Sequence, residues 1–363
     1  MILDQLTLVN FKNLTQKEFR FNERINCFVG QNGVGKTNVL DGIYTLSMTK
    51  SYFNPISGQN INHGADFFML EGHYSAASKK EKVVCSLKRG QKKVLKRNGK
   101  LYDKISEHIG LVPVVIISPA DRDLIVEGSE TRRKFIDSVI SQMNPVFLGA
   151  SVSYNKVISQ RNALLKYFHA NRTFDALSLE AFNVQMIRYG EVIHRERSFF
   201  LKEFSPLFQK YYDEISGGRE EVSLNYKSAL NDSTFEQVLE DALPKDRAVQ
   251  YSSAGVHKDD LIFELGAYPV KKFGSQGQQK TFLVALKLAQ YEFLKNHTQK
   301  KPILLLDDIF DKLDDDRVKS LIQLVNADDF GQIFISDTHD DRTRAVVSQA
   351  GEGFEIFNLE HEH

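Results

Sequence analysis

The sequence has little cysteine, no net charge and no long apolar run. Its two cysteines, Cys27 and Cys85, fit a reducing cytosol, and Cys27 lies in an apolar run as a small core residue would. No apolar run approaches the roughly 20 residues of a membrane-spanning helix. The first four residues include Asp4, an acid where a signal peptide has positive charge. We therefore expect a cytoplasmic protein of 363 residues without a membrane partner.

Because the net charge is zero, the protein as a whole does not attract polyanions such as nucleic acids. Lysine plus arginine and aspartate plus glutamate both count 47, so a nucleic-acid partner would have to meet a local basic patch. Residues 79–104 offer one, with eleven basic residues against two acids, an excess of nine. The basic residues are Lys79, Lys80, Lys82, Lys88, Arg89, Lys92, Lys93, Lys96, Arg97, Lys100 and Lys104.

Asn98-Gly99 lies inside this basic stretch and predicts a β-hairpin with a type I′ turn. A hairpin with exposed lysines can follow a DNA phosphate backbone. Lysines also protect an edge strand from aggregation. The residues alone leave both interpretations open.

A glycine-rich segment near the start of the chain has the pattern of a phosphate-binding loop. An apolar run at 25–29 precedes it and a helix-competent run at 38–43 follows it. In such loops the backbone amides and the helix N-terminus face phosphate oxygens, the lysine reaches the terminal phosphates, and the hydroxyl binds Mg²⁺. The residues concerned are Gly30, Gln31, Asn32, Gly33, Val34, Gly35, Lys36 and Thr37. The sequence therefore predicts a binding site for a nucleoside triphosphate.

The remaining patterns predict an α/β domain interrupted by a helical lobe. Strands are expected at 2–9 (an edge strand), 18–21, 67–74, 81–87, 112–117, 302–306 and, as the last one, 332–336. Helical patterns dominate from 119 to 245, where Glu191–Arg197 looks like a solvated helix face, and further helices are expected at 281–296 and 316–325. We assign 1–118 and 300–363 to a nucleotide-binding lobe and 119–299 to the helical lobe.

Hydrolysis needs a carboxylate that holds Mg²⁺ at the end of a buried strand. Asp307 directly follows four aliphatic residues, whereas Asp121 is separated from its strand by Ser118-Pro119-Ala120. We choose Asp307 for the metal and expect Asp308, on the other side of the chain, to face the γ-phosphate and polarise water.

A second anion-binding segment opens the helix expected before this strand. It contains Ser275, Gly277 and Gln278, about 30 residues before the acidic pair. If it belongs to the other lobe, it can cap the γ-phosphate of a partner subunit, so that ATP joins two copies.

Together these segments resemble the ATP-binding-cassette (ABC) heads of the SMC/Rad50 group, and most closely the bacterial RecF family. Besides the phosphate loop and Asn98-Gly99, the resemblance is carried by four short strings. They are Asn10-Phe11-Lys12-Asn13, Arg132-Arg133-Lys134-Phe135-Ile136-Asp137, Gly255-Val256-His257-Lys258-Asp259-Asp260-Leu261 and Phe273-Gly274-Ser275-Gln276-Gly277-Gln278.

The resemblance covers essentially the full length. It implies an ABC-type P-loop ATPase head, a mixed sheet with flanking helices, that carries an inserted, mainly helical second lobe with the signature motif. It also implies an ATP-dependent homodimer that binds duplex DNA near single-strand gaps, hydrolyses ATP slowly with Mg²⁺, and cooperates with RecR and RecO in loading RecA.

The resemblance also assigns roles to individual residues. Catalytic roles fall to Asp308 and Lys36, and metal binding to Thr37 and Asp307. The nucleotide is contacted by Lys12, Asn13, the loop residues 30–37, Asn38, the trans-acting Ser275, Gly277 and Gln278, and His339 as a switch, for which Asp337 is the alternative.

Four features depart from the family pattern. The turn after the acidic pair reads Asp311-Lys312-Leu313-Asp314 where Ser-Glu-Leu-Asp is usual, and Asp308 stands where glutamate is typical. A switch histidine usually follows the last strand directly, but His339 comes two residues after Asp337, and no glutamine is obvious after residue 117.

Two other classes share the phosphate loop. A nucleotide-binding subunit of an ABC transporter would bind a membrane permease, but the separation of 271 residues between Lys36 and Asp307 and the basic hairpin disfavour it. Heads of other SMC-like complexes usually carry hundreds of heptad residues at the insertion, and none are sustained here.

Overall fold

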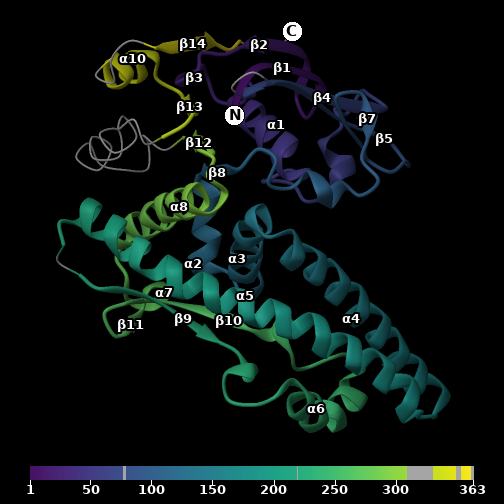
Figure 1. Ribbon diagram of the computed structural model, residues 1–363. Coiled ribbons are helices and arrows are strands. Elements are labelled where there is room, and N and C mark those ends of the chain that lie inside the picture. Colours follow the sequence, from purple (N-terminus) through teal and green to yellow (C-terminus); the bar gives the residue numbers. More distant parts are fainter. Residues whose placement is uncertain (77–78, 219, 309–329, 349–352, 361–363) are drawn as a thin grey trace. The chain divides into compact units, whose positions relative to one another are not determined.

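The computed structural model describes residues 1–76, 79–218, 220–308, 330–348 and 353–360 (Figure 1). The helix expected at 316–325 and the turn Asp311–Asp314 lie outside the described residues. The chain divides into two units. Unit 1 contains Met1–Arg122, Tyr211–Arg219 and Gln276–His363, and unit 2 contains Asp123–Lys210 and Glu220–Ser275.

A five-stranded parallel sheet forms the centre of unit 1. Its order is β14 (Phe354–Asn358), β3 (Ile25–Val29), β13 (Ile333–Asp337), β12 (Ile303–Asp307) and β8 (Val114–Ile117). The middle strands and β8 are buried throughout, as parallel strands covered on both faces usually are. The expectation that 332–336 is the last strand is wrong, because β14 follows. That strand is only partly buried at the sheet edge and lacks a continuous apolar run.

A second, antiparallel sheet of unit 1 has six strands. Its order is β2 (Leu14–Arg20), β1 (Ile2–Phe11), β4 (Phe67–Ala76), β5 (Lys79–Lys88), β6 (Val94–Arg97) and β7 (Lys100–Leu101). The expected edge strand at 2–9 is therefore an interior strand, since β1 pairs with both β2 and β4. Its sequence alternates only imperfectly because a register shift lies between Leu3 and Gln5.

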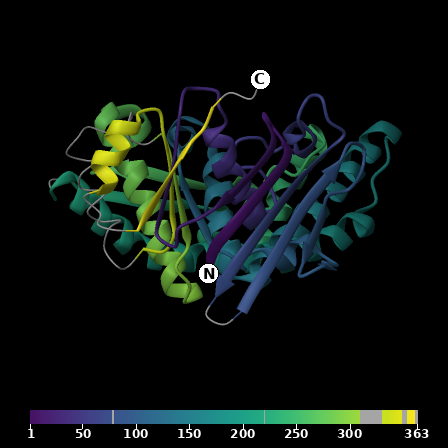
Figure 2. The ribbon, with the colours of Figure 1, turned by 90° about the horizontal axis from the view of Figure 1, so that it is seen from above.

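Helix α1 (Lys36–Met48) connects the two sheets of unit 1. It contacts β1 and β4 of the antiparallel sheet and β12 and β13 of the parallel one, and eleven of its thirteen residues are buried. Figure 2 shows α1 between the two groups of strands. Unit 1 also contains the short 3₁₀ turns η1 (Ser57–Asn60), η2 (Ile105–His108) and η3 (Pro119–Arg122), and helix α10 (Asp340–Ser348).

Helix α8 (Gln276–Thr298) belongs to unit 1, so the predicted lobe boundaries differ from the observed ones. Its apolar residues pack in unit 1, where Phe282 contacts the ring of Tyr212 and Tyr291 stacks on Phe330 at a centroid distance of 4.4 Å. The helix also starts five residues earlier than expected. The boundary consequently falls between Ser275 and Gln276.

Unit 2 combines helices with a small antiparallel sheet. The helices are α2 (Asp123–Val126), α3 (Ser129–Met143), α4 (Pro145–Asn171), α5 (Ala176–Ser216, whose last turns belong to unit 1), α6 (Phe235–Val249) and α7 (Val270–Phe273). The sheet has the order β11 (Tyr268–Pro269), β10 (Asp260–Leu265) and β9 (Val222–Lys227), with η4 (Ala229–Asn231) and η5 (Val256–Lys258) beside it. Strand β9 was not expected.

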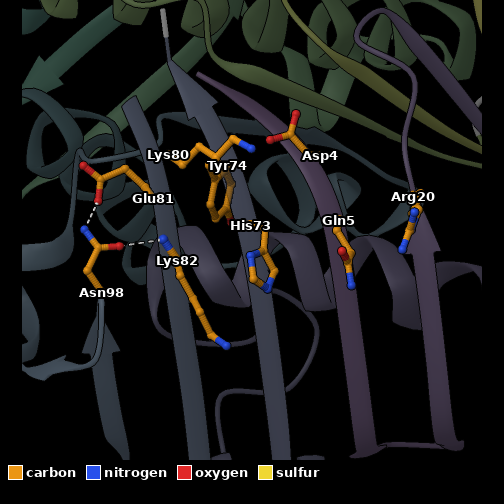
Figure 3. Close-up of a pocket in the computed structure, with 9 residues that line it drawn as sticks. All are labelled: Asp4, Gln5, Arg20, His73, Tyr74, Lys80, Glu81, Lys82 and Asn98. Atoms are coloured by element: carbon orange, nitrogen blue, oxygen red, sulfur yellow. Dashed lines mark hydrogen bonds between the residues drawn. The ribbon is translucent and has the colours of Figure 1, made fainter. Parts of the chain in front are cut away.

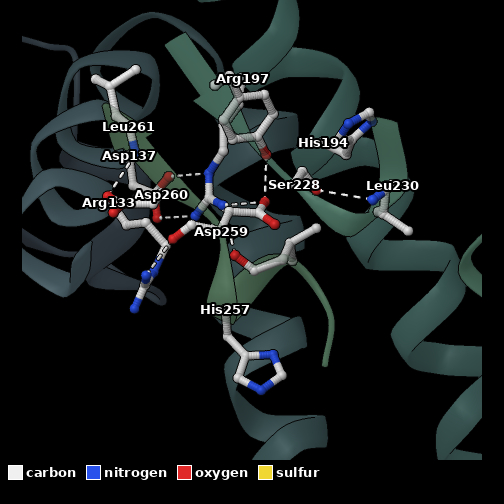
Figure 4. Close-up of polar contacts among 12 residues, drawn as sticks. Arg133, Asp137, His194, Arg197, Ser228, Leu230, His257, Asp259, Asp260 and Leu261 are labelled. Carbon is white, nitrogen blue, oxygen red and sulfur yellow. Dashed lines mark hydrogen bonds and ion pairs between the residues drawn. The ribbon is translucent and has the colours of Figure 1, made fainter. Parts of the chain in front are cut away.

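Arg197 on α5 corrects the expectation of a solvated face at 191–197. The residue is 3% exposed, and its guanidinium donates to both carboxylate oxygens of Asp137 and to Asp259 (Figure 4). Its neighbour Arg195 is exposed as expected. A buried arginine is tolerated where carboxylates neutralise it and accept its N–H groups. These contacts tie α5 to α3 and to the start of β10.

Candidate functional site: a phosphate loop beside a buried carboxylate

The loop between β3 and α1 requires glycine at two positions. Gly30 has φ 150°, and a Cβ there would lie 2.4 Å from the carbonyl oxygen of Leu359, which follows β14. Gly35 has φ 105°, and its Cβ would lie 2.6 Å from Leu14 Cδ2. No side chain fits either position without displacing its neighbour. The loop is thus held closely against the antiparallel sheet and the last strand.

Lys36 places a positive charge inside this loop. Its Nζ donates to the carbonyl oxygens of Gly30 at 2.7 Å and Gln31 at 2.9 Å, and the residue is 5% exposed. Lys36 is also the first residue of α1, whose first turn contains no acid. The ammonium group of Lys36 and the positive end of the helix dipole therefore both attract an anion bound in the loop. Gln31 and Asn32 are exposed at the loop surface, whereas Val34 is buried under it.

Thr37 and Asp307 meet at the carboxyl edge of the parallel sheet. The Thr37 hydroxyl donates to Asp307 Oδ1 at 2.8 Å, and Ser336 on the adjacent strand donates to the same oxygen at 2.7 Å. Burial raises the pKa of Asp307, although these two hydrogen bonds and the charge of Lys36 oppose the rise. In phosphate-loop proteins, Mg²⁺ is bound by the hydroxyl that follows the loop lysine and by a carboxylate. Thr37 and Asp307 are groups of these two kinds.

Asp308 leaves the strand in a left-handed conformation. Its φ is 47°, and its backbone N–H donates to Ser336 Oγ at 3.1 Å. Aspartate is among the few residues that adopt this conformation readily. That the Asp308 carboxylate faces the γ-phosphate stays a prediction.

Asp121, the other candidate for the metal, lines one hollow with Asp307 but already has a cationic partner. It forms a buried ion pair with Lys287 of α8 at 2.7 Å, and it accepts hydrogen bonds from the Tyr52 hydroxyl and the Ser118 backbone N–H. The side chains of Asp121 and Lys287 are 2% and 4% exposed. The structure therefore brings Asp307, and not Asp121, to Thr37.

Asn13 braces the phosphate loop from the β1–β2 turn. Its Nδ2 donates to the carbonyl oxygen of Gly33 at 2.7 Å, and its Oδ1 accepts from Asn38 Nδ2 at 2.6 Å. Lys12 instead forms an ion pair with Asp41 on α1 at 2.6 Å. Asn13 thus links the loop to Asn38 on α1, while Lys12 pairs with another residue of the same helix.

The predicted signature segment crosses the boundary between the units. Ser275 is the last residue of unit 2, whereas Gly277 and Gln278 lie in the first turn of α8 in unit 1. Within unit 1, Gln276, Gln279 and Lys280 line a hollow of about 320 Å³ together with Asp307 and Ser118. Sequence reasoning missed these three α8 residues, because the segment was assigned to the other lobe.

The two candidates for the switch residue have different surroundings. Asp337 is 1% exposed and accepts hydrogen bonds from Thr343 Oγ1 at 2.8 Å, from the Thr338 N–H at 2.7 Å and from the Arg342 guanidinium. These contacts secure the start of α10. The side chain of His339 is exposed beyond the end of β13.

The basic hairpin has the expected turn. Asn98 and Gly99 have φ of 51° and 81°, and Arg97 pairs with Lys100 across the turn, which matches type I′. Arg97 donates to Glu81 through Nε at 2.9 Å and Nη2 at 2.6 Å, and this contact lowers the pKa of Glu81 to about 2.

Several cations of the basic stretch have partners within the sheet region. Lys93 donates to the Thr49 carbonyl oxygen at 2.6 Å, and Lys82 pairs with Glu71 at 2.6 Å. Three lysines of the hairpin itself are exposed: Lys92, Lys96 and Lys100.

The same sheet carries a shallow hollow of about 420 Å³ beside the hairpin. Figure 3 shows its lining across β2, β1, β4 and β5, including Arg20, His73, Lys80 and Lys82. Asp4 and Glu81 also line it, so the charge is mixed. Basic residues outside the hairpin are exposed as well: Lys79, Lys80, Lys82, Lys88, Arg89 and Lys104.

Comparison with known proteins decides the family. Residues 2–357 match the family model of the RecF/RecN/SMC N-terminal domain. A DNA replication and repair protein RecF from Flavobacterium johnsoniae is 56% identical over 359 residues, which are 99% of this chain and 100% of that protein. The chain belongs to the RecF family. A RecF protein from Phocaeicola vulgatus is 47% identical over 99% of this chain and 97% of its own length.

Solved structures agree with RecF membership. The recombination mediator protein RecF-ATP of the RecFOR pathway superposes with a TM-score of 0.90 at 29% identity, over 99% of this chain and 95% of the other. An Smc head domain from Pyrococcus furiosus has a TM-score of 0.55 at 15% identity over 99% of this chain and 94% of the other, which shows a shared fold. The fold is thus the ABC-type ATPase head of RecF and SMC proteins. Within the described residues, every helix is too short or too polar to span a membrane.

Proposed function

We propose that this RecF-family chain is an ATP-dependent DNA-binding switch of recombinational repair and replication. The observation that carries the proposal is the contact of Thr37 with Asp307 beside the enclosed ammonium of Lys36. It joins a phosphate loop with an acidic strand end, the two parts that Mg²⁺-ATP requires. The structure of a RecF-ATP complex, with a chain of the same fold, supports ATP as the nucleotide.

The residues divide the work of binding and hydrolysis. The loop amides of 30–37 and Lys36 bind the phosphates, while Asn13 and Asn38 hold the loop in shape. Thr37 and Asp307 would hold Mg²⁺, which would neutralise phosphate charge. Asp308 orients the attacking water and accepts its proton. Because aspartate reaches less far than the glutamate typical of these heads, hydrolysis is slow.

Two subunits complete the site. Ser275, Gly277 and Gln278 of one copy cap the γ-phosphate bound by the other, since a helix N-terminus favours anions. His339, which is exposed after β13, contacts the γ-phosphate and loses this contact when hydrolysis removes the phosphate. ATP therefore closes a homodimer and hydrolysis opens it. When the nucleotide binds, Lys12 leaves its ion pair with Asp41 and contacts a phosphate or the base.

DNA is the partner of the closed dimer. The exposed lysines of the hairpin contact phosphates of duplex DNA near single-strand gaps, and the duplex stimulates the weak ATPase. RecR and RecO then bind this complex, and RecA is loaded on the adjacent single strand. The similar RecF structures are described as part of the RecFOR pathway, which supports RecO and RecR as partners.

Sedimentation velocity with and without ATP, and with and without gapped DNA, tests the proposal. We expect dimers only with ATP and a further shift with DNA. Lys36→Met should abolish nucleotide binding and dimers together, whereas unchanged ATP affinity would remove the phosphate-loop assignment. A wild-type chain that stays monomeric with its loop saturated would refute the switch.

A further inference from the structure

Unit 2 contains a hollow that the nucleotide and DNA sites do not use. It has a volume of about 820 Å³ and lies between the C-terminal end of α4, the following residues 172–174 and the last turns of α6. Its apolar lining includes Leu165, Phe168 and Phe174, and its polar lining includes His169, Arg172 and Arg247.

The floor of the hollow is part of a small hydrophobic core. Leu165 is 1% exposed and Phe168 is 7% exposed, and both pack with Leu179 of α5. Phe174 contacts Phe168 edge-to-face at 5.5 Å between ring centroids and remains 36% exposed. An apolar side chain entering the hollow would therefore meet aromatic and aliphatic surface that is already ordered.

The rim of the hollow is cationic. The guanidinium of Arg247 lies 4.1 Å from the ring centroid of Phe174, and the exposed side chains of His169 and Arg172 are the other basic groups. None of the nine lining residues is acidic. Such a rim attracts anionic groups, carboxylates among them, more strongly than neutral polar groups.

The loop that carries this rim is fixed by its own hydrogen bonds. The Thr173 N–H donates to the Phe168 carbonyl oxygen at 3.0 Å, and Asp175 accepts from the Leu177 N–H at 3.0 Å to begin α5. Arg172 closes α4 with φ 52°, a left-handed position where glycine is the usual residue. A preformed hollow loses little entropy when it binds.

We infer that this hollow binds an acidic peptide segment of a protein partner, with one apolar side chain on the floor and adjacent carboxylates on the arginine rim. The charge and the apolar floor together select this occupant. A nucleic acid fits less well, because Arg247 covers the exposed ring of Phe174 that a base would stack on. Binding here does not depend on the proposed ATP switch, since every lining residue belongs to unit 2.

The experiment measures fluorescence anisotropy of a fluorescein-labelled peptide, Asp-Glu-Glu-Leu-Ala-Phe, on the full-length chain without nucleotide. Arg172→Gly removes a rim charge while glycine suits the backbone, so the variant should fold at least as well. Together with Arg247→Gln it should weaken binding about tenfold or more. Ala248→Trp fills the exposed lining of the hollow without changing charge and should abolish binding. Lys202→Ala, an exposed lysine elsewhere on α5, is the matched control and should bind normally.

Further probes separate the partner classes. A peptide with Asn and Gln in place of the acids should lose most of its affinity, and raising the salt concentration should weaken the acidic one. Absence of peptide binding to wild type, or equal binding to Ala248→Trp, would overturn the inference. So would a labelled duplex that loses affinity for Arg172→Gly/Arg247→Gln while the peptide does not, because the rim would then serve DNA.

Discussion

The hydroxyl of Thr37 lies 2.8 Å from Oδ1 of Asp307, although 270 positions separate the two residues. The contact depends on strand order, since β13 lies between β3 and β12 and supplies Ser336 to the same oxygen. A metal ion bound there would therefore be held by two segments that lie far apart in the sequence.

Asp307→Asn should separate charge from shape at this position. The amide oxygen can still accept from Thr37 and Ser336, so the fold should persist. Burial already raises the pKa of Asp307, and a neutral group relieves that cost. We expect an unchanged or higher Tm and a loss of about tenfold or more in Mg²⁺-dependent ATP affinity, measured by calorimetry. Ser336→Ala, which keeps the carboxylate, should lose much less; equal losses would assign the effect to packing.

Ser275→Arg should leave ATP binding intact and prevent ATP-induced dimers, because a bulky cation replaces the proposed cap on the partner's phosphate. Sedimentation velocity at saturating ATP measures this. Lys36→Met is the comparison, since it should lose binding and dimers together. A Ser275→Arg protein that dimerises normally would refute the trans role.

Replacing Lys92, Lys96 and Lys100 with Gln should weaken duplex binding and reduce the salt slope by up to about three, roughly one for each lost phosphate contact. Fluorescence titrations at several salt concentrations measure the slope. Arg97→Gln is the matched control, because its guanidinium is bound to Glu81 and its loss should affect hairpin stability more than DNA affinity. If the triple variant binds DNA normally but aggregates, the lysines protect an edge strand instead.

Arg197→Met should destabilise the protein by about 3–5 kcal/mol, because Asp259 would keep a buried charge without this partner and the partly exposed Asp137 would lose both of its hydrogen bonds to Arg197. Urea unfolding followed by circular dichroism measures the loss. Arg195→Met, two positions away and exposed, should stay within about 0.5 kcal/mol of wild type. Similar losses in both variants would contradict the buried network.

His257 should make stability depend on pH. Its Nε2 donates to the Ser252 carbonyl oxygen at 2.9 Å, so Nδ1 accepts from the Tyr154 hydroxyl at 3.1 Å in the neutral ring. Burial lowers the pKa of His257 from 6.5 to about 4. The unfolded chain therefore binds a proton first as the pH falls. This stability is complete above pH 6.5 and is lost toward pH 4, by up to about 3 kcal/mol at 1.4 kcal/mol per pH unit.

His257→Gln keeps a donor and an acceptor but does not titrate. Urea unfolding at pH 7, 6 and 5 should show a shallower decline for this variant than for wild type. Parallel declines would show that other groups set the acid sensitivity.

The parts of the site that short segments encode could be predicted from the sequence. Gly30 and Gly35 predict the phosphate loop, and Asn98-Gly99 predicts the hairpin turn. Both depend on backbone conformations with positive φ, which these residue types adopt readily. The choice of Asp307 over Asp121 rested on the distance of each acid from its strand, and the structure brings Asp307 to Thr37.

The remaining features depend on partners far along the chain. Arg197 looks like a surface residue until Asp137 and Asp259, 60 and 62 positions away, are brought beside it. Strand β14 gives no apolar run because it is an edge strand. Lys93 is satisfied by a carbonyl oxygen 44 positions earlier, so counting charges overstated the basic surface of the hairpin.

Leu359 supplies a wall of the phosphate loop, through its N–H to Val29 and its carbonyl oxygen against Gly30. A ribosome makes Gly30 long before Leu359, so the nascent loop lacks this wall until Leu359 has been translated. A protease that cut the chain between β13 and Leu359 would likewise remove this wall without cutting near the loop in the sequence.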